Sequence, residues 1–166
     1  HAPQKRPAAA EWLRGLVRTW DILIPCANPA CSHQAFVLAD PRAVRCPFCG
    51  TPHPKGTLPV LKLRSERRSG QWLPDGQIVA FHNQSLFPWH VFDNVYSGEL
   101  AELTPQAYCV FHQGRWLLIN QTLDSLTSPG GNRVPIGSAV ELKDKAQFRL
   151  SQQPHGRIAE VQLLQV

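Results

Sequence analysis

The chain has 166 residues, of which 43% are hydrophobic and 17% charged, enough apolar sequence for one sizeable domain or a medium domain with a small appended one. This composition excludes a disordered chain, and we find neither a bilayer-spanning apolar run nor a secretory signal, so we expect a cytoplasmic protein that is not bound to a membrane. The formal charge of +5 is uneven, because residues 1–75 carry eleven Lys/Arg against five Asp/Glu and residues 76–166 carry six against seven. Since the sequence contains no methionine, we expect it to be a piece of a longer protein.

The first predicted element is an amphipathic helix within residues 1–21. The segment PAAAEWLRGLVRTW places Arg14 and Arg18 outside a continuous apolar face. That face consists of Ala9, Trp12, Leu13, Leu16, Val17 and Trp20. An apolar helix face normally packs against another surface, either the body of the same domain or the upstream part of a longer protein. The sequence does not distinguish between these two packing partners.

Residues 22–57 contain four of the five cysteines in two close pairs, Cys26, Cys31, Cys46 and Cys49. Four residues separate the first pair, two separate the second, and fourteen lie between the pairs. Zinc prefers four soft ligands at tetrahedral corners, and a short turn supplies two of them. The spacer SHQAFVLADPRAVR predicts two short strands around the Asp40-Pro41 turn, which brings the pairs together. The segment therefore predicts a zinc ribbon with one Zn²⁺.

Two disulfides, or four unrelated buried thiols, are the alternatives to a metal site. The odd number of cysteines and the lack of a secretory signal argue against disulfides. His33 and His53 are close enough in sequence to act as substitute ligands, but four cysteines already complete a zinc shell. A complete shell has no position for water, so we expect a structural metal. Cys109 is interpreted as an ordinary core residue.

Residues 58–166 are interpreted as a β-sandwich or barrel, because short apolar runs alternate with turn residues and show no helical period. Gln113-Gly114 predicts a tight hairpin, and Asp75-Gly76 predicts a second turn. The predicted strands cover residues 58–63, 77–82, 89–92, 107–112, 115–120, 138–142, 146–150 and 157–166.

The segment GRWLLINQTLDSLTSPGGNRVPIGSAVELKDKAQFRLS resembles the C-terminal half of a forkhead-associated (FHA) domain. AVELKDKAQFRLS fits the last strand pair of that family, with Lys145 where the family favours Gly, and LFPWHVF places His90 at the Ser-Arg-x-His motif. The resemblance covers about residues 58–166. It implies a mainly β fold in which a short helix and a zinc ribbon precede an FHA-like antiparallel β-sandwich.

The residues that bind phosphothreonine in the FHA family are missing here. No Gly-Arg precedes HNQS, Phe87 occupies the place of the Ser, and SLTSPGG replaces Asn-Gly-Thr. We therefore do not expect phosphothreonine binding.

The order of zinc ribbon, GTLPVLKL and FHA-like sandwich also resembles the C-terminal region of certain bacterial protein kinases. These kinases belong to a phosphorylation triad associated with tellurite resistance, together with a von Willebrand A protein and a PP2C-type phosphatase. The resemblance implies that this region is a docking module, and that its partner is a von Willebrand A protein that binds a carboxylate through a surface metal.

Such a partner requires an exposed carboxylate on a loop, since a hard divalent ion prefers oxygen ligands. Asp93, in FDNVYSGE, is our first candidate, with Trp89, Phe92 and Tyr96 as possible anchors. Asp124, in QTLDSLTS, is the second. The alternatives are that both carboxylates cap their own turns and that the aromatic side chains only pack in the core.

We expect no enzymatic activity in these 166 residues. His82, His90 and His112 lie among apolar residues without a carboxylate at a suggestive spacing, and no phosphate loop, nucleophile elbow or His-Glu-x-x-His motif is present. The parent protein can still contain a kinase domain.

A nucleic-acid-binding zinc-ribbon and β-barrel protein is the alternative function. The segment LKLRSERRSGQW places four basic residues at a strand end and turn, close to Trp72. These residues are Lys62, Arg64, Arg67 and Arg68. The same charges can also protect an edge strand from pairing with other chains.

Overall fold

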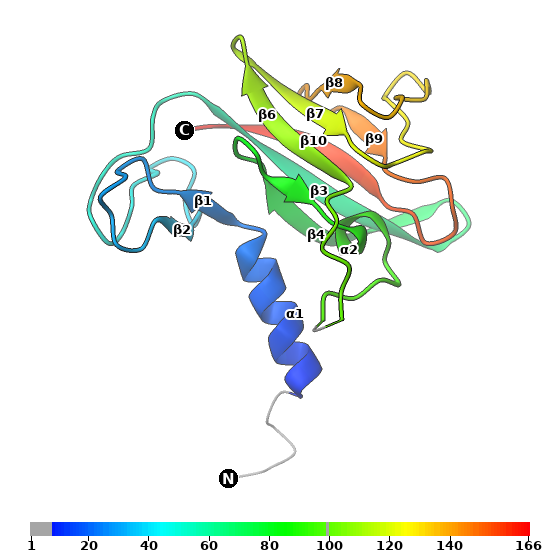
Figure 1. Ribbon diagram of the computed structural model, residues 1–166, viewed down its shortest axis with the longest axis horizontal. Helices are drawn as coiled ribbons and strands as arrows, with labels where there is room; N and C mark the ends of the chain where they lie inside the picture. Colours follow the sequence, from blue (N-terminus) through cyan, green and yellow to red (C-terminus); the bar gives the residue numbers. More distant parts are fainter. Residues whose placement is uncertain (1–7, 99) are drawn as a thin grey trace.

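The computed structural model describes residues 8–98 and 100–166, so the start of the predicted N-terminal segment, residues 1–7, lies outside the described residues. Strands make up 39% of the structure and helices 10%, which confirms the predicted mainly β class with an N-terminal helix and antiparallel sheets (Figure 1). The elements are α1 (Ala9–Trp20), β1 (Leu23–Pro25), β2 (Ala35–Val37), β3 (Thr57–Arg68), β4 (Gln71–Val79), β5 (Ser85–Leu86), α2 (Pro88–Val91), β6 (Ala107–His112), β7 (Arg115–Asn120), β8 (Ala139–Glu141), β9 (Gln147–Arg149) and β10 (Ile158–Gln165).

Two four-stranded antiparallel sheets form the sandwich in the described part of the chain, in the orders β4-β3-β10-β9 and β5-β6-β7-β8. Leu61 and Phe148 from the first sheet and Leu86 and Leu118 from the second belong to one buried apolar cluster. In β6 and β7, buried side chains alternate with more exposed ones because the side-chain period of a strand is two. The two sheets therefore share one core.

The hairpin of β3 and β4 differs from the prediction. Its turn is at Ser69-Gly70, and Asp75-Gly76 lies inside β4 at a register shift opposite residues 62–64. Gly76 adopts a φ of 130°, which places it in the region that favours glycine. The predicted turn at Asp75-Gly76 is therefore wrong, and these residues form a bulge in a longer strand.

The predicted strand at residues 89–92 is also wrong, because residues 88–91 form the short helix α2. Pro88 begins this helix, where its fixed φ suits the first turn, and the Phe87 N–H donates to His90 Nδ1 over 2.9 Å. A short apolar run does not distinguish a strand from a buried helix by its pattern. Proline and the local hydrogen bond decide the structure here.

Each cysteine pair lies on its own small hairpin. β1 precedes Cys26 and pairs with β2, and an isolated bridge between Arg45 and Pro52 encloses the second pair. The prediction of two strands around Asp40-Pro41 is wrong, because only residues 35–37 form a strand and their partner precedes the first cysteine. Ile24 and Phe36 are buried in the common core, so the hairpin of β1 and β2 packs on the sandwich.

The N-terminal helix is confirmed, but no residue of α1 is buried. Trp12, Leu16 and Trp20 are 62%, 63% and 67% exposed. Figure 1 shows that α1, which precedes β1 in the chain, projects away from the sandwich. The body of the domain therefore does not bury the apolar face of α1. Separately, no helix within the described residues is long and apolar enough to cross a membrane.

The hairpin between β6 and β7 yields a test of the fold. His112 pairs with Arg115, and both residues of the loop between them have a positive φ, 48° at Gln113 and 76° at Gly114, as in a type I′ turn. We predict that Gly114→Ala lowers the free energy of unfolding by about 1 kcal/mol, measured by urea denaturation, because Ala is strained at a positive φ.

Gly130→Ala is the matched control, since Gly130 has no positive φ and an added Cβ would meet Asn132 Nδ2 at an ordinary distance of 3.5 Å. It should change stability much less. If Gly114→Ala is as stable as the wild-type chain, the assigned turn is wrong.

Candidate metal centre and docking surface

The four predicted ligands Cys26, Cys31, Cys46 and Cys49 converge, with all four sulfur atoms within 4.8 Å of one another. The Sγ–Sγ distance is 3.5 Å between Cys26 and Cys49 and 3.8 Å between Cys31 and Cys46. A tetrahedral site with metal–sulfur bonds of about 2.3 Å separates its sulfur atoms by about 3.8 Å. All five cysteines are free thiols. The cluster therefore fits a metal ion.

Backbone groups of the two hairpins orient the thiols. The Asn28 N–H donates to Cys26 Sγ over 3.4 Å, and the Gly50 N–H donates to the carbonyl of Cys46. Gly50, the residue after the second pair, takes a φ of 72°, which glycine adopts without strain. Both turns are therefore shaped by local hydrogen bonds that leave the sulfur atoms pointing at one another.

Local hydrogen bonds and neighbouring thiols shift the pKa values of Cys26 and Cys49. Hydrogen bonds with Thr51 lower the pKa of the Cys49 thiol to about 6. The Asn28 N–H lowers the pKa of the Cys26 thiol, but desolvation and the neighbouring thiols outweigh it and raise that pKa to about 12. Four adjacent thiolates need a cation to balance their charge, because a bound metal deprotonates its thiol ligands.

Neither nearby histidine belongs to the thiol cluster. His33 stacks on Phe48 with 3.7 Å between ring centroids, and His53 Nδ1 lies 2.9 Å from the carbonyl of Pro54. Cys109 is fully buried elsewhere in the core, where burial raises the pKa of its thiol to about 12. The interpretation of Cys109 as a core residue is confirmed.

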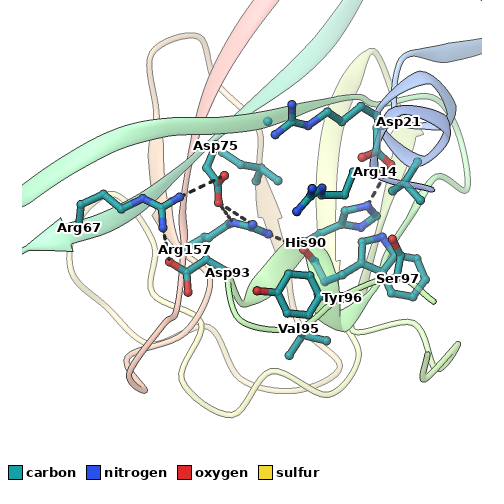
Figure 2. A pocket seen from close by; sticks show the side chains of 15 residues that line it. Arg14, Asp21, Arg67, Asp75, His90, Asp93, Val95, Tyr96, Ser97 and Arg157 are labelled. Atoms are coloured by element: carbon teal, nitrogen blue, oxygen red, sulfur yellow. Dashed lines mark hydrogen bonds and ion pairs between the residues drawn. The ribbon is translucent and has the colours of Figure 1, made fainter. Parts of the chain in front are cut away.

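A buried polar cluster fixes α2 to the first sheet (Figure 2). Arg157 is 8% exposed and donates through Nη2 to Asp75 Oδ2 over 2.6 Å, through Nε to Ser65 Oγ over 3.1 Å, and through Nη1 to the carbonyl of Trp89. Its own N–H donates to the carbonyl of Val91. One guanidinium therefore connects β3, β4 and α2.

His90 connects α2 to the end of α1. Its Nδ1 accepts the Phe87 N–H, so its Nε2 carries the proton and donates to Asp21 Oδ1 over 3.0 Å (Figure 2). Asp21 is the C-terminal capping residue of α1, and its carbonyl accepts the Val79 N–H from β4. Both ring nitrogens of His90 thus have structural partners, and the side chain is 97% buried.

Asp93 is not the exposed carboxylate that we predicted. Its side chain is 7% exposed, with Oδ1 2.8 Å from His155 Nδ1 and Oδ2 3.8 Å from Arg67 Nη1. Asp124 is exposed and makes no ion pair with a described residue. Of the two candidate carboxylates, only Asp124 lies open to a partner.

The predicted aromatic anchors lie around the polar cluster. Tyr96 is 71% exposed, while Trp89 and Phe92 are half-buried. Trp89 stacks on Phe87 at 4.7 Å, and Phe92 forms an isolated bridge with Gly156. The structure therefore brings Trp89 and Tyr96 to the rim of one open cavity together with Asp93, and leaves Tyr96 accessible.

Most of the predicted basic turn is strand rather than turn. Arg64 pairs with Glu160 over 2.9 Å, and Arg67 pairs with Asp75 and Asp93. Arg149, not a residue of this group, lies over the Trp72 ring. Two of the four predicted cations are therefore engaged with carboxylates of the chain itself.

An apolar groove that no sequence pattern predicted lies between α1 and residues in and around α2. Its volume is about 360 Å³, and its walls are Leu13, Leu16, Val17 and Trp20 from α1, with Phe87, Trp89, Ala101 and Leu103 opposite. In the sequence, the signal for this groove was an apolar residue, Leu103, in a segment with no predicted strand. The structure leaves Leu103 exposed and without regular secondary structure. Without tertiary structure, nothing placed that segment beside α1.

We predict that the folded chain binds about one metal ion and that Cys46→Ser abolishes this binding and lowers the melting temperature. An incomplete ligand set loses the metal together with the folding free energy that the metal supplies. Elemental analysis and thermal unfolding measure the two effects. Cys109→Ala is the control, because it removes a thiol outside the cluster and should retain the metal. A metal-free wild-type chain that is equally stable with and without chelator would contradict the prediction.

We predict that Asp75→Asn lowers the free energy of unfolding at pH 7 by about 3 kcal/mol, because it leaves Arg157 buried without its counterion. Partial burial raises the pKa of Asp75, but hydrogen bonds from Ser65 and Arg157 and the charges of Arg157 and Arg67 outweigh it and lower that pKa. The carboxylate therefore stabilises the fold above its unfolded pKa of about 3.9, and this contribution is lost as the pH falls through the lower folded pKa.

The stability difference between wild type and Asp75→Asn should consequently shrink below about pH 4, as followed by denaturation at a series of pH values. Asp40→Asn is the control, since Asp40 pairs with Arg42 at an exposed site. Its effect should stay below about 1 kcal/mol. Equal effects of the two substitutions would show that the Arg157 cluster is not important for stability.

Comparisons with known proteins yield no family model, no curated protein and no solved structure that matches the chain.

Proposed function

We propose that the chain is a non-enzymatic docking module that recruits a protein partner and is stabilised by one structural zinc ion. The observation that carries this proposal is the apolar face of α1, which includes Trp12, Leu16 and Trp20 and which the domain leaves uncovered beside an apolar groove. Soluble domains rarely leave such a surface without a function in binding. Aromatic side chains are also typical of the energetically important centre of an interface.

Zinc is the metal that best suits this thiol cluster. Four cysteine sulfur atoms at tetrahedral separations are typical of structural zinc sites, and zinc has no redox chemistry or geometric preference that conflicts with them. The set leaves no coordination position for a substrate. A cytoplasmic location is part of the proposal, because a reducing compartment keeps the cysteines available as thiolates.

The resemblance to the kinase tail of the tellurite-associated triad makes a von Willebrand A protein a candidate partner. If this partner binds through a surface metal, Asp124 is the carboxylate that the structure favours, because Asp93 is engaged with Arg67 and His155. Nucleic acid binding is less favoured, because Arg64 and Arg67 are engaged in ion pairs.

We predict that a protein partner is captured from the native cell extract by the wild-type chain and is not captured by Leu16→Asp. A charge in the centre of the apolar face should prevent its burial. The pull-down is performed after nuclease treatment, so that proteins held only by nucleic acid are removed. Ile136→Asp is the matched control, because Ile136 is 56% exposed in a loop outside the groove, and it should capture the partner normally.

Asp124→Asn without chelator, and the wild-type chain with chelator, test the metal-bridged contact in the same experiment. Loss of capture in both cases would support the von Willebrand A model. Either of two results would contradict the docking function itself. One is that nuclease treatment removes everything that the chain captures, and the other is that Leu16→Asp captures the same proteins as the wild-type chain.

A further inference from the structure

The apolar groove is continuous with the charged cavity of about 520 Å³ beside it. Both are bounded by Val17, Asp21, Trp89, His90 and Ser97. One side of this combined surface is apolar, and the other contains the side chains around Arg157 (Figure 2). A partner that occupies the groove therefore meets the charged cavity along one edge.

The carboxylates of the charged cavity are already engaged. Asp75 binds Arg157, Asp93 binds His155 and Arg67, and Asp21 binds His90. Their side chains are also mostly buried, with exposures of 15%, 7% and 10%. The negative charge of the cavity is therefore directed inward.

Two arginines of the cavity, Arg14 and Arg18, are not paired with the carboxylates of the described residues. Arg14 and Arg18 lie four residues apart on α1, line the cavity, are exposed, and form no ion pair with a described residue. Figure 2 shows the Arg14 side chain at the edge of the cavity beside α1. Glu11, the acidic residue of the first turn of α1, is occupied by the N–H of Ala8 over 2.6 Å. The rim beside the apolar groove is therefore positively charged.

We propose that the groove binds an amphipathic helix of a partner protein, with acidic residues flanking its apolar face. This inference rests on the proposed docking function and names the class of segment that docks. The apolar anchors of such a helix, at positions i, i+3, i+4 and i+7, cover the exposed side chains of α1, as in other helix-in-groove complexes. Its carboxylates pair with Arg14 and Arg18, and this complementarity decides orientation and specificity.

Charge also distinguishes this occupant from a second copy of the chain. Pairing α1 with α1 brings Arg14 and Arg18 of both copies to one interface, and each helix offers in return only Glu11, which binds its own backbone. The chain as a whole carries +5. Like charges across an interface disfavour association, so an acidic segment of another protein fits better.

The test is a selection from a displayed library of helical peptides, performed against the complete chain. The library keeps an apolar stripe at i, i+3, i+4 and i+7 and varies the flanking positions among Asp, Glu, Gln, Ser, Lys and Arg. We expect Asp and Glu to be enriched at the flanks. The affinity of a selected acidic peptide should fall about tenfold for the double variant Arg14→Gln/Arg18→Gln, and by at least as much for Leu16→Asp.

The reversed variant Arg14→Glu/Arg18→Glu should select Lys and Arg at the same positions, which a merely structural role of the arginines would not produce. Arg115→Glu/Arg133→Glu is the matched control, since both residues are exposed outside the groove, and it should bind the acidic peptides as the wild-type chain does.

Three outcomes would overturn the inference. The first is that the peptides selected by the wild-type chain have neutral or basic flanks, and the second is that Leu16→Asp does not change peptide binding. The third is that sedimentation shows a dimer of the chain that Leu16→Asp dissociates. A partner captured from the extract through α1, together with selected peptides that lack acidic flanks, would reject only this inference and leave the docking function standing. Failure of the extract experiment would reject the docking function itself.

Discussion

The position of the short helix α2, and with it the whole candidate surface, depends on the buried guanidinium of Arg157. A charge in this environment costs several kcal/mol unless it is paired, so its partners must come together when the chain folds. Asp75 supplies the counterion from β4, Ser65 accepts a hydrogen bond on β3, and the carbonyl of Trp89 accepts one on α2. The requirement to satisfy one side chain thus connects three elements that are all distant in sequence from Arg157.

The C-terminal end of α1 is held in place by His90, the residue of α2 that follows Trp89. His90 receives the Phe87 N–H on one nitrogen and donates to Asp21 from the other, so its orientation and tautomer are determined by its neighbours. Asp21 then holds the last turn of α1 against β4 through its carbonyl. The helix is positioned by these polar contacts at its end, and its apolar face takes no part in them. This explains how a helix can have a defined position and still expose Leu16 and Trp20.

The thiol cluster constrains the chain between α1 and the sandwich. β1 and β2 have three residues each, which is too short for a hairpin that is stable in isolation. Ile24 and Phe36 anchor them in the common core, and a metal held by the four cysteines would close both turns at once. The cysteine-containing segment therefore connects the body of the domain to the helix that we propose as its docking element.

Sequence patterns by themselves determined the mainly β class, the amphipathic helix, the Gln113-Gly114 hairpin and the convergence of four cysteines, because each depends on residues close together along the chain. They did not predict that Asp75-Gly76 forms a bulge, that residues 88–91 form a helix, or that Asp93 is buried. Pairing between distant segments decides these features: β3 holds the bulge in register, and Arg67 and His155 enclose Asp93. The groove has the same origin, since only the folded chain places α1 beside Trp89, Ala101 and Leu103, and local patterns carry no information about that contact.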